Sequence, residues 1–291
     1  MAFVNSEFKL FLGGTGFSDN SSSEPPSRPA PPPVEVLASE VSSTVKCLLE
    51  AVNLDGLTLL KARVSTEEVL GVPDSDLVPG VYEGGLKLWE GSLDLVKALR
   101  SEIHKGELSL KGKKVLELGC GHGLPGIFAC LEGATAVHFQ DFNAEVLRCL
   151  TIPNVNANLT DTTPIFETEV RYFAGDWSQV HQCLPHEYNI ILMAETIYAI
   201  SAQQSLYKLI KKSRRFRTAV HETSWWSYIH GSQKALFWSW WRNPPVSVYG
   251  EERRLMCVAG VMDASLVAEV ADDSSNVREV WKLSVKRGLK S

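Results

Sequence analysis

Several features that whole classes of protein depend on are missing from this sequence. No uninterrupted apolar stretch reaches the roughly 20 residues that a membrane-spanning helix needs. Residues 1–11 contain no basic region followed by a long apolar run, so we expect no secretory signal. The 6 cysteines show no C-x-x-C spacing, which argues against a zinc site and a dense disulfide framework. We therefore interpret them as reduced thiols in a cytosolic or nuclear protein, and we expect no membrane as a partner.

An excess of positive charge is also missing. The chain has 29 Lys and Arg against 34 Asp and Glu, a formal net charge of -5. A general nucleic-acid binder needs a basic surface to displace counterions from phosphates, so no direct nucleic-acid binding is expected. With 291 residues, 44% of them hydrophobic, the chain is long and apolar enough to bury a core. We expect a globular protein that is a monomer.

The chain divides into a tail and one domain. Residues 13–33 are rich in Gly, Ser and Pro, a composition that cannot bury enough surface to offset the entropy of ordering. Residues 1–33 are therefore predicted to be a disordered tail or linker, and residues 34–291 a single folded domain.

Short apolar runs alternate with helical patterns along that domain. Strands are predicted at 113–118, 136–140, 170–173 and 188–194, and a final pair at 264–270 and 278–285. Helices are predicted over 92–104, 124–131 and 144–150, the first with Ser92 as its N-terminal cap. Alternating strands and helices of this kind predict a doubly wound, Rossmann-like α/β sheet with helices on both faces.

The strongest local signal follows the first of these strands. Glu117, Gly119, Gly121 and Gly123 form an acid and a glycine turn, and a helix begins directly after them. Glycines allow a tight turn and a close approach of backbone to a ligand. A carboxylate just before the turn would repel a pyrophosphate on the helix start. The pattern therefore favours a cofactor with a positive end, such as S-adenosylmethionine, over a dinucleotide.

The next two strand ends also carry acids. Asp141 is predicted to accept hydrogen bonds from both ribose hydroxyls of such a cofactor, and the alternative is that it caps the following helix. Asp176 and Trp177, after Gly175, are candidates to contact an adenine ring. The alternative for this pair is a turn with a core tryptophan.

Several segments together resemble one family of enzymes. Residues 81–90, 117–126, 138–143, 151–155, 175–178 and 195–198 are similar in order and spacing to the protein-histidine N-methyltransferases. The resemblance implies a class I, seven-strand methyltransferase fold and S-adenosylmethionine as cofactor. It further implies transfer of a methyl group to the distal (tele) imidazole nitrogen of a histidine in a large-subunit ribosomal protein, in the cytoplasm and nucleus.

Carried over by position, the resemblance also implies a set of site residues. The residues expected to contact the cofactor are Leu88, Trp89, Glu90, Gly119, Asp141, Phe142, Asn143, Gly175, Asp176, Trp177 and Ala194, in addition to Glu117 and Gly121. The family often has serine at the position of Ala194. Glu195 and Tyr198 are the candidates to orient the acceptor imidazole, with a wall of the cofactor pocket as the alternative for Tyr198.

The family pattern is interrupted between about 213 and 262. This segment holds five of the chain's 8 tryptophans without helical or strand periodicity. One interpretation is a specialised aromatic binding patch. The other is a shifted reading frame, because back-translation of residues 230–242, displaced by one base, permits Met-Ala-Ala-Lys-Lys-His-Tyr-Phe-Gly-Val-Gly-Gly, which resembles the family.

Two alternatives to a histidine methyltransferase remain open. A protein-lysine methyltransferase of the same wider group would share the cofactor half of the chain. A non-catalytic binding protein would keep the fold and have lost the acceptor loop.

Overall fold

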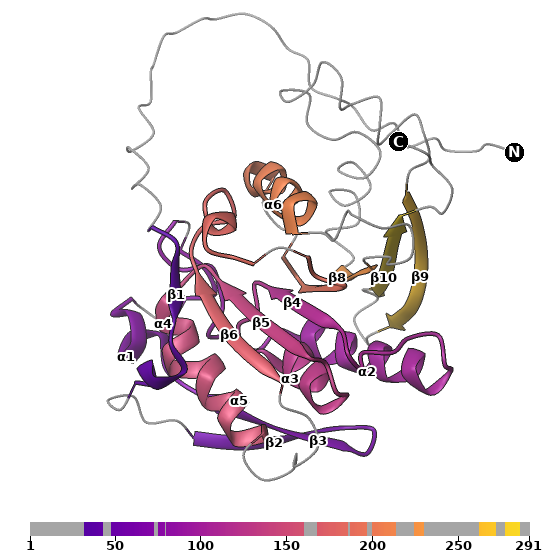
Figure 1. The fold of residues 1–291 in the computed structure, drawn as a ribbon. Coiled ribbons are helices and arrows are strands. Elements are labelled where there is room, and N and C mark those ends of the chain that lie inside the picture. The colour runs from indigo at the N-terminus through magenta and orange to yellow at the C-terminus, as the bar shows by residue number, and fades with distance from the viewer. Residues whose placement is uncertain are drawn as a thin grey trace, which may run out of the picture.

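A computed structural model describes residues 32–42, 48–72, 75–78, 80–159, 168–185, 187–196, 200–213, 224–229, 262–271 and 277–285. The predicted tail, residues 1–33, lies outside this part of the chain except for its last two residues. The described residues form an eight-stranded sheet flanked by helices, and a separate two-stranded hairpin (Figure 1). None of the described helices is long and apolar enough to cross a membrane.

Five parallel strands make up the middle of the large sheet. In spatial order they are β6 (Glu169–Ala174), β5 (Ala136–Asp141), β4 (Lys114–Leu118), β7 (Ile190–Ala194) and β8 (Ser224–Ile229). Their sequences are apolar because both faces of the sheet are covered, and every residue of β5 is buried. The four strands predicted between residues 113 and 194 are therefore confirmed.

Antiparallel strands close both edges of this sheet. β10 (Val277–Val285) pairs with β8, and β9 (Met262–Ala271) pairs with β10. At the opposite edge β1 (Val34–Val36) pairs with β6. The predicted final pair of strands is confirmed, and β1 is an addition to the seven strands expected.

The segment between 213 and 262 contributes one described strand. β8 lies within it and occupies the fifth parallel position, next to β7. Residues 214–223 and 230–261 lie outside the described residues, so the shifted-frame and aromatic-patch hypotheses both stay predictions.

Helices cover both faces of the sheet. Residues of α2 (Glu90–His104), α3 (Leu124–Leu131) and α5 (Ile152–Leu159) pack into one hydrophobic cluster with one face. Residues of α6 (Ile200–Ser213) and the short turn η3 (Val180–Gln182) pack into the cluster on the other face. The predicted doubly wound architecture is confirmed.

Two details of the helix predictions were wrong. α2 begins at Glu90, and the Ser92 hydroxyl donates to the Trp89 carbonyl at 2.9 Å instead of capping the helix start. The helix expected to end at 150 continues as α4 (Ala144–Val146), a π-helical turn (Leu147–Thr151) and α5. Pro153 has no N–H for the usual helical bond, and the wider π turn just before it accommodates this loss.

A hairpin not anticipated from the sequence precedes α1 (Thr66–Leu70). β2 (Leu48–Leu54) and β3 (Leu57–Arg63) pair across the two-residue turn Asp55-Gly56, in which both residues have positive φ. Asp-Gly is a strong signal for this type of turn. The hairpin packs against α5, where Asn158 bonds both backbone groups of Leu60.

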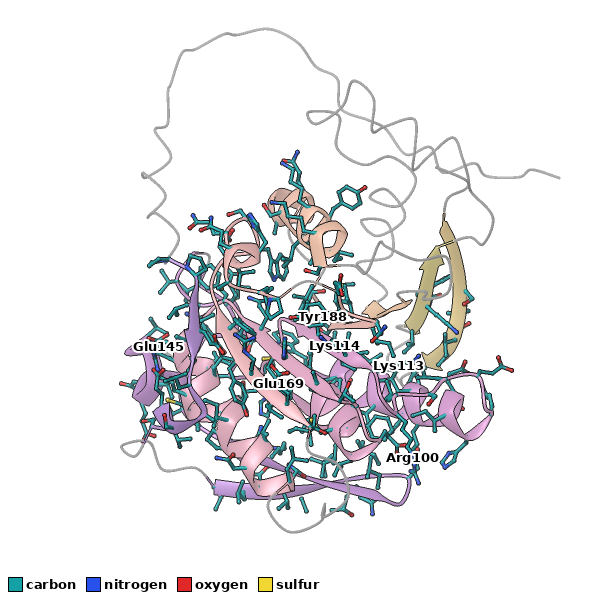
Figure 2. All side chains as sticks on the ribbon, viewed as in Figure 1. Arg100, Lys113, Lys114, Glu145, Glu169 and Tyr188 are labelled. Atoms are coloured by element: carbon teal, nitrogen blue, oxygen red, sulfur yellow. The ribbon has the colours of Figure 1, made fainter. Side chains whose placement is uncertain are left out.

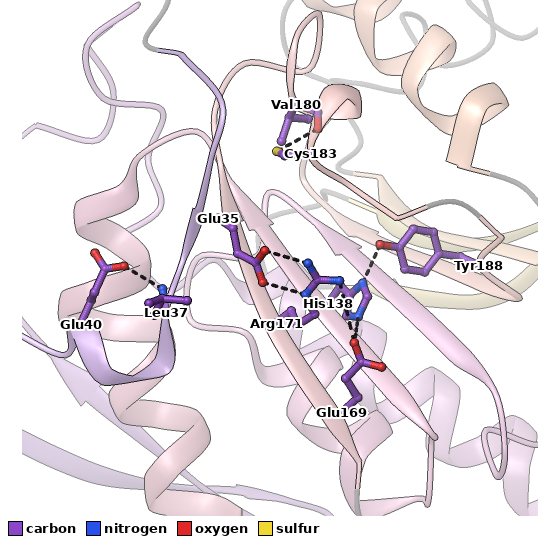
Figure 3. Close-up of polar contacts among 9 residues, drawn as sticks. All are labelled: Glu35, Leu37, Glu40, His138, Glu169, Arg171, Val180, Cys183 and Tyr188. Atoms are coloured by element: carbon purple, nitrogen blue, oxygen red, sulfur yellow. Dashed lines mark hydrogen bonds and ion pairs between the residues drawn. The ribbon is translucent and has the colours of Figure 1, made fainter.

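The amino ends of the parallel strands carry a network of polar side chains. Arg171 of β6 makes two 2.7 Å bonds to Glu35 of β1, which ties the edge strand to the sheet (Figure 3). His138 of β5 is buried, and its Nδ1 lies 2.7 Å from the hydroxyl of Tyr188. Figure 2 shows Tyr188 and Glu169 at the same end of the sheet as the start of β4. Most of these polar groups bond within the network, whereas Nε2 of His138 lies 3.6 Å from Oε1 of Glu169, too far for a hydrogen bond.

Candidate functional site

A cavity of about 730 Å³ lies at the carboxyl ends of the strands. This is where open α/β sheets usually bind ligands. Most of the predicted site residues line it, namely Leu88, Trp89, Glu117, Gly119, Gly121, Asp141, Phe142, Gly175, Asp176, Trp177, Ala194 and Glu195. Residues from four separate strand ends therefore meet around one space, as the sequence predicted.

Two positions of the glycine turn after β4, Gly119 and Gly121, leave no room for a side chain. Gly119 and Gly121 have φ of 61° and 48°, a conformation that other residues rarely adopt. A Cβ on Gly119 would lie 2.8 Å from Cγ2 of Thr196, and one on Gly121 would lie 2.9 Å from the carbonyl oxygen of Gly85. The segment before α2 therefore closes directly over the turn, and this packing forms one wall of the cavity.

Glu117 is a buried carboxyl group at the base of the turn. It accepts a 2.8 Å hydrogen bond from the backbone N–H of Gly126 in α3. Burial raises its pKa to about 8, and the nearby Asp141 adds to the increase. A cation beside this group would favour its charged form and a phosphate would disfavour it. The site is therefore suited to a ligand with a positive end.

Asp141 closes β5 with its carboxyl group directed to the glycine turn. Its Oδ2 accepts from the N–H of Gly121 at 3.0 Å, and its Oδ1 accepts from the N–H of Asn143 at 3.1 Å. Burial raises its pKa to about 6, against the lowering effect of these backbone donors. The residue at the helix N-cap is Asn143, so the helix-cap alternative for Asp141 was wrong.

Asn143 and Glu90 do not line the cavity. The side-chain amide of Asn143 donates to the carbonyl of Val81 at 2.8 Å, which holds the segment before α2 in place. Glu90 is the exposed first residue of α2. Asn143 therefore belongs to the structure that supports the cavity wall.

Asp176 and Trp177 combine the two interpretations given for them. The Asp176 carboxylate accepts from the backbone N–H of Ser178 at 2.8 Å, as expected of a turn residue. Both residues also line the cavity. The indole N–H of Trp177 donates to Oε1 of Gln140 at 2.9 Å, which fixes the ring against the end of β5.

Glu195 links the end of β7 to the start of α2. Its φ of 54° is unusual for a residue other than glycine, and its Oε1 accepts from the backbone N–H of Gly91 at 3.1 Å. Such strain is commonly found at functional sites. Tyr198, the other predicted catalytic residue, lies outside the described part of the chain.

Trp89 forms part of the opposite wall. Its indole N–H donates to the carbonyl of Gly84 at 3.0 Å, and the ammonium of Lys87 lies 4.6 Å from the ring centroid. Lys87 also pairs with Asp76 at 2.6 Å. These contacts fix the position of the residues that precede α2, which form this wall of the cavity.

Sequence reasoning missed several residues around the cavity. The additional lining residues include Glu83, Gly84, Gly85, Lys87, His122 and Thr196. The Gly84-Gly85 pair was a visible signal, because paired glycines are typical of a close backbone approach. In the structure a Cβ on Gly85 would lie 2.9 Å from Oδ2 of Asp141. Glu83 and Lys87 carry no distinctive pattern, since their position depends on how the segment before α2 folds back. His122 and Thr196 lie next to the predicted site residues Gly121 and Glu195.

Comparisons with known proteins agree with this arrangement. Residues 80–223 match the family model described as lysine methyltransferase. The histidine protein methyltransferase 1 homolog of Dictyostelium discoideum is 38% identical over 216 residues, which cover 73% of this chain and 61% of that protein. The homolog of Bos taurus is 35% identical over 211 residues, 62% of this chain and 56% of that protein.

Solved structures show a similar but more distant likeness. The magnesium protoporphyrin IX methyltransferase of Synechocystis PCC 6803, solved with bound S-adenosylhomocysteine, aligns with a TM-score of 0.44 and 13% identity. The alignment covers 67% of this chain and 83% of that protein.

The strand order, the glycine turn and the cavity define the class I methyltransferase fold. The chain is similar to the histidine protein methyltransferases, as the sequence resemblance predicted. S-adenosylmethionine is the cofactor of the methyltransferases that the chain resembles. The chain spans 61% and 56% of the length of the two relatives described above.

Proposed function

We propose that this chain is an S-adenosylmethionine-dependent protein-histidine N-methyltransferase. Its acceptor is a histidine of a large-subunit ribosomal protein, methylated at the tele nitrogen, and it works as a monomer in the cytoplasm and nucleus. The observation that carries the proposal is the single cavity around which Glu117, Asp141, Trp177 and Glu195 meet. The matches to histidine protein methyltransferases support the choice of acceptor residue.

The residues present fit this cofactor. Glu117, buried at the glycine turn, suits the positive methionine end, and Asp141 suits the two ribose hydroxyls. The half-buried Trp177 offers a ring face to adenine. The cavity is also lined by no phosphate-binding cluster of basic side chains, since Lys87 is the single Lys or Arg among its described lining residues.

The reaction requires little acid–base chemistry. When bound, the cofactor supplies an electrophilic methyl group on a sulfonium, so the N–CH₃ bond forms as the S–CH₃ bond breaks and sulfur keeps the electron pair. Catalysis is then mainly positioning, with the imidazole nitrogen about 3 Å from the methyl carbon. Glu195, which follows β7, orients the imidazole and accepts its N–H proton, and we assign the same orienting role to Tyr198.

Product analysis tests the proposal. Large-subunit ribosomal proteins are incubated with the chain and with S-adenosylmethionine labelled in the methyl group, and the hydrolysed protein is separated into methylated amino acids. We expect label in tele-methylhistidine, and none with a Gly119→Arg variant, whose side chain fills the turn.

Other outcomes would contradict it in distinct ways. Label in methyllysine would favour a lysine methyltransferase, which the description of the matching family model makes the second candidate. A chain that binds S-adenosylhomocysteine but transfers no methyl group would favour the non-catalytic binding protein.

A further inference from the structure

Gln140 is a buried polar residue of β5 that the proposed reaction does not use. Its side chain has no exposed surface, and it is not among the residues that line the cavity. Its amide Nε2 donates to the carbonyl of Gly175 at 2.9 Å. Its Oε1 accepts from the indole N–H of Trp177 at 2.9 Å and from the backbone N–H of Gly119 at 3.4 Å. These three partners do line the cavity.

The position of Gln140 explains how one side chain reaches all three. β5 lies between β4 and β6, and Gln140 pairs in register with Leu118 of β4 and Phe173 of β6. Gly119 directly follows β4, and Gly175 directly follows β6. The amide therefore sits at the point where three adjacent strand ends meet.

The orientation of this amide is fixed by its partners. Two of them are donors and one is an acceptor, so a flipped amide would face two N–H groups with its own N–H₂ and the Gly175 carbonyl with its oxygen. A side chain without these groups would remove the hydrogen-bond partner of the carbonyl of the buried Gly175 and of the half-buried Trp177 indole. The structure of the cavity wall thus depends on a residue that a bound ligand does not touch.

We propose that Gln140 is a positioning residue for the adenosine half of the cofactor, acting by holding the Trp177 indole and the Gly175 carbonyl in their places on the cavity wall. This inference rests on the proposed cofactor site. The two shorter bonds both go to the segment after β6, whereas the bond to the glycine turn is the longest of the three. The main effect of Gln140 therefore falls on the adenine side.

Calorimetric binding to a Gln140→Met variant tests this role. Methionine has a similar length and no hydrogen-bonding amide, so it keeps the packing volume and removes all three bonds. The ligands are S-adenosylhomocysteine and 5′-methylthioadenosine, which contains the adenosine half but no amino-acid group. We expect both to bind at least tenfold more weakly to the variant than to the unmodified chain, by a similar factor.

Asn189→Leu serves as the matched control. Asn189 is also a buried amide at a strand of the same sheet, and its Oδ1 accepts from the backbone N–H of Lys114 at 2.9 Å. It lies at the amino ends of the strands, away from the cavity. We expect this variant to lose stability and to bind both ligands as the unmodified chain does.

A double-mutant cycle that combines Gln140→Met with Trp177→Phe shows whether Gln140 acts through the indole. Phenylalanine keeps an aromatic ring and removes the N–H, so the affinity losses of the two single variants should not add in the double variant. If Gln140→Met does not fold, Trp177→Phe alone carries the test, and we expect it to weaken binding of 5′-methylthioadenosine.

Four results would overturn the positioning role. These are unchanged binding in Gln140→Met, an equal loss in Asn189→Leu, a loss for S-adenosylhomocysteine alone, and strictly additive losses in the cycle. If Gln140→Met does not fold, unchanged binding of 5′-methylthioadenosine to Trp177→Phe overturns the positioning role. A folded unmodified chain that binds neither ligand would instead overturn the proposed cofactor site, and the inference with it.

Discussion

Two of the three buried polar side chains of strand β5, His138 and Gln140, lie two residues apart on one face of the sheet, and their surroundings differ. At the amino end, His138 contacts Tyr188 and lies 3.6 Å from Glu169, so polar groups there meet one another. At the carboxyl end, the partners of Gln140 line a large cavity. The same strand therefore uses one buried polar residue to hold the fold together and another to shape a binding site.

The largest expected effect concerns the carboxyl end. Gly119→Arg places a side chain where even a Cβ would lie 2.8 Å from Thr196, so it should abolish cofactor binding. S-adenosylhomocysteine at 100 times its dissociation constant should stabilise the unmodified chain by about 2.7 kcal/mol and raise its melting temperature. The variant should show no rise in a thermal-shift measurement.

The matched control for this change is Gly106→Arg. Gly106 also has a positive φ, of 76°, but a Cβ there would meet nothing within 4 Å. It should cost stability through backbone strain and still show the ligand-induced rise. A ligand-induced rise in the melting temperature of Gly119→Arg, or no such rise in Gly106→Arg, would contradict the assignment of the glycine turn to the cofactor site.

The two ends should also respond to pH in opposite directions. Burial lowers the pKa of His138 to about 4, so its stabilising contribution is present above the unfolded value of about 6.5 and is lost as pH falls toward 4. Burial raises the pKa of Glu117 to about 8, so its contribution is present below about 4.5 and is lost as pH rises toward 8. Each effect should be on the order of 3–5 kcal/mol, with that of Glu117 the larger.

Variants without these groups reveal how much each group contributes to the pH dependence of the free energy of unfolding. Relative to the unmodified chain, His138→Gln should gain free energy of unfolding as pH falls from 6.5 to 4, and Glu117→Gln should gain as pH rises from 4.5 to 8. Urea denaturation over this pH range measures both differences. Differences that do not change with pH would contradict the burial argument for that end.

Two aromatic substitutions, each of which removes one hydrogen-bonding group, compare the ends most closely. Tyr188→Phe removes the hydroxyl that meets His138, and should lower the free energy of unfolding by about 1–2 kcal/mol without changing ligand affinity. Trp177→Phe removes the N–H that meets Gln140, and should weaken S-adenosylhomocysteine binding about tenfold. Denaturation and calorimetry on both variants check this, and a reversed pattern would mean that the two networks have the opposite roles.

The smallest effect is expected at Ser92. Its hydroxyl donates to the Trp89 carbonyl and does not satisfy an N–H at the start of α2. Ser92→Ala should therefore change the free energy of unfolding by less than the roughly 1 kcal/mol typical of a lost cap. A loss of 1 kcal/mol or more in chemical denaturation would restore the capping role predicted from the sequence.

The central sheet was predictable because its strands leave a strong signal. A strand that is covered on both faces has a short apolar sequence, and β4 and β7 have such sequences. The hairpin β2–β3 was missed, although Asp55-Gly56 is the turn pair that such hairpins favour. The length of the helical segment after β5 was missed because Pro153 suggests a helix end, and nothing local reveals that a π turn absorbs it.

Some residues of the candidate site could likewise be predicted from the sequence, and others could not. Glycines and acids at strand ends have a chemical reason to be there, so Gly119 and Asp141 could be predicted. Gln140 and Lys87 gave no such signal, because their roles depend on partners that are distant in sequence or on a segment that folds back over the turn.

The most direct test of the account is calorimetric titration of S-adenosylhomocysteine into the purified chain. Because its cavity is formed by Glu117, Asp141 and Trp177 around a closed glycine turn, we predict one binding site with a micromolar dissociation constant. A chain that is folded by circular dichroism and takes up no ligand would contradict the assignment of this cavity as a cofactor site.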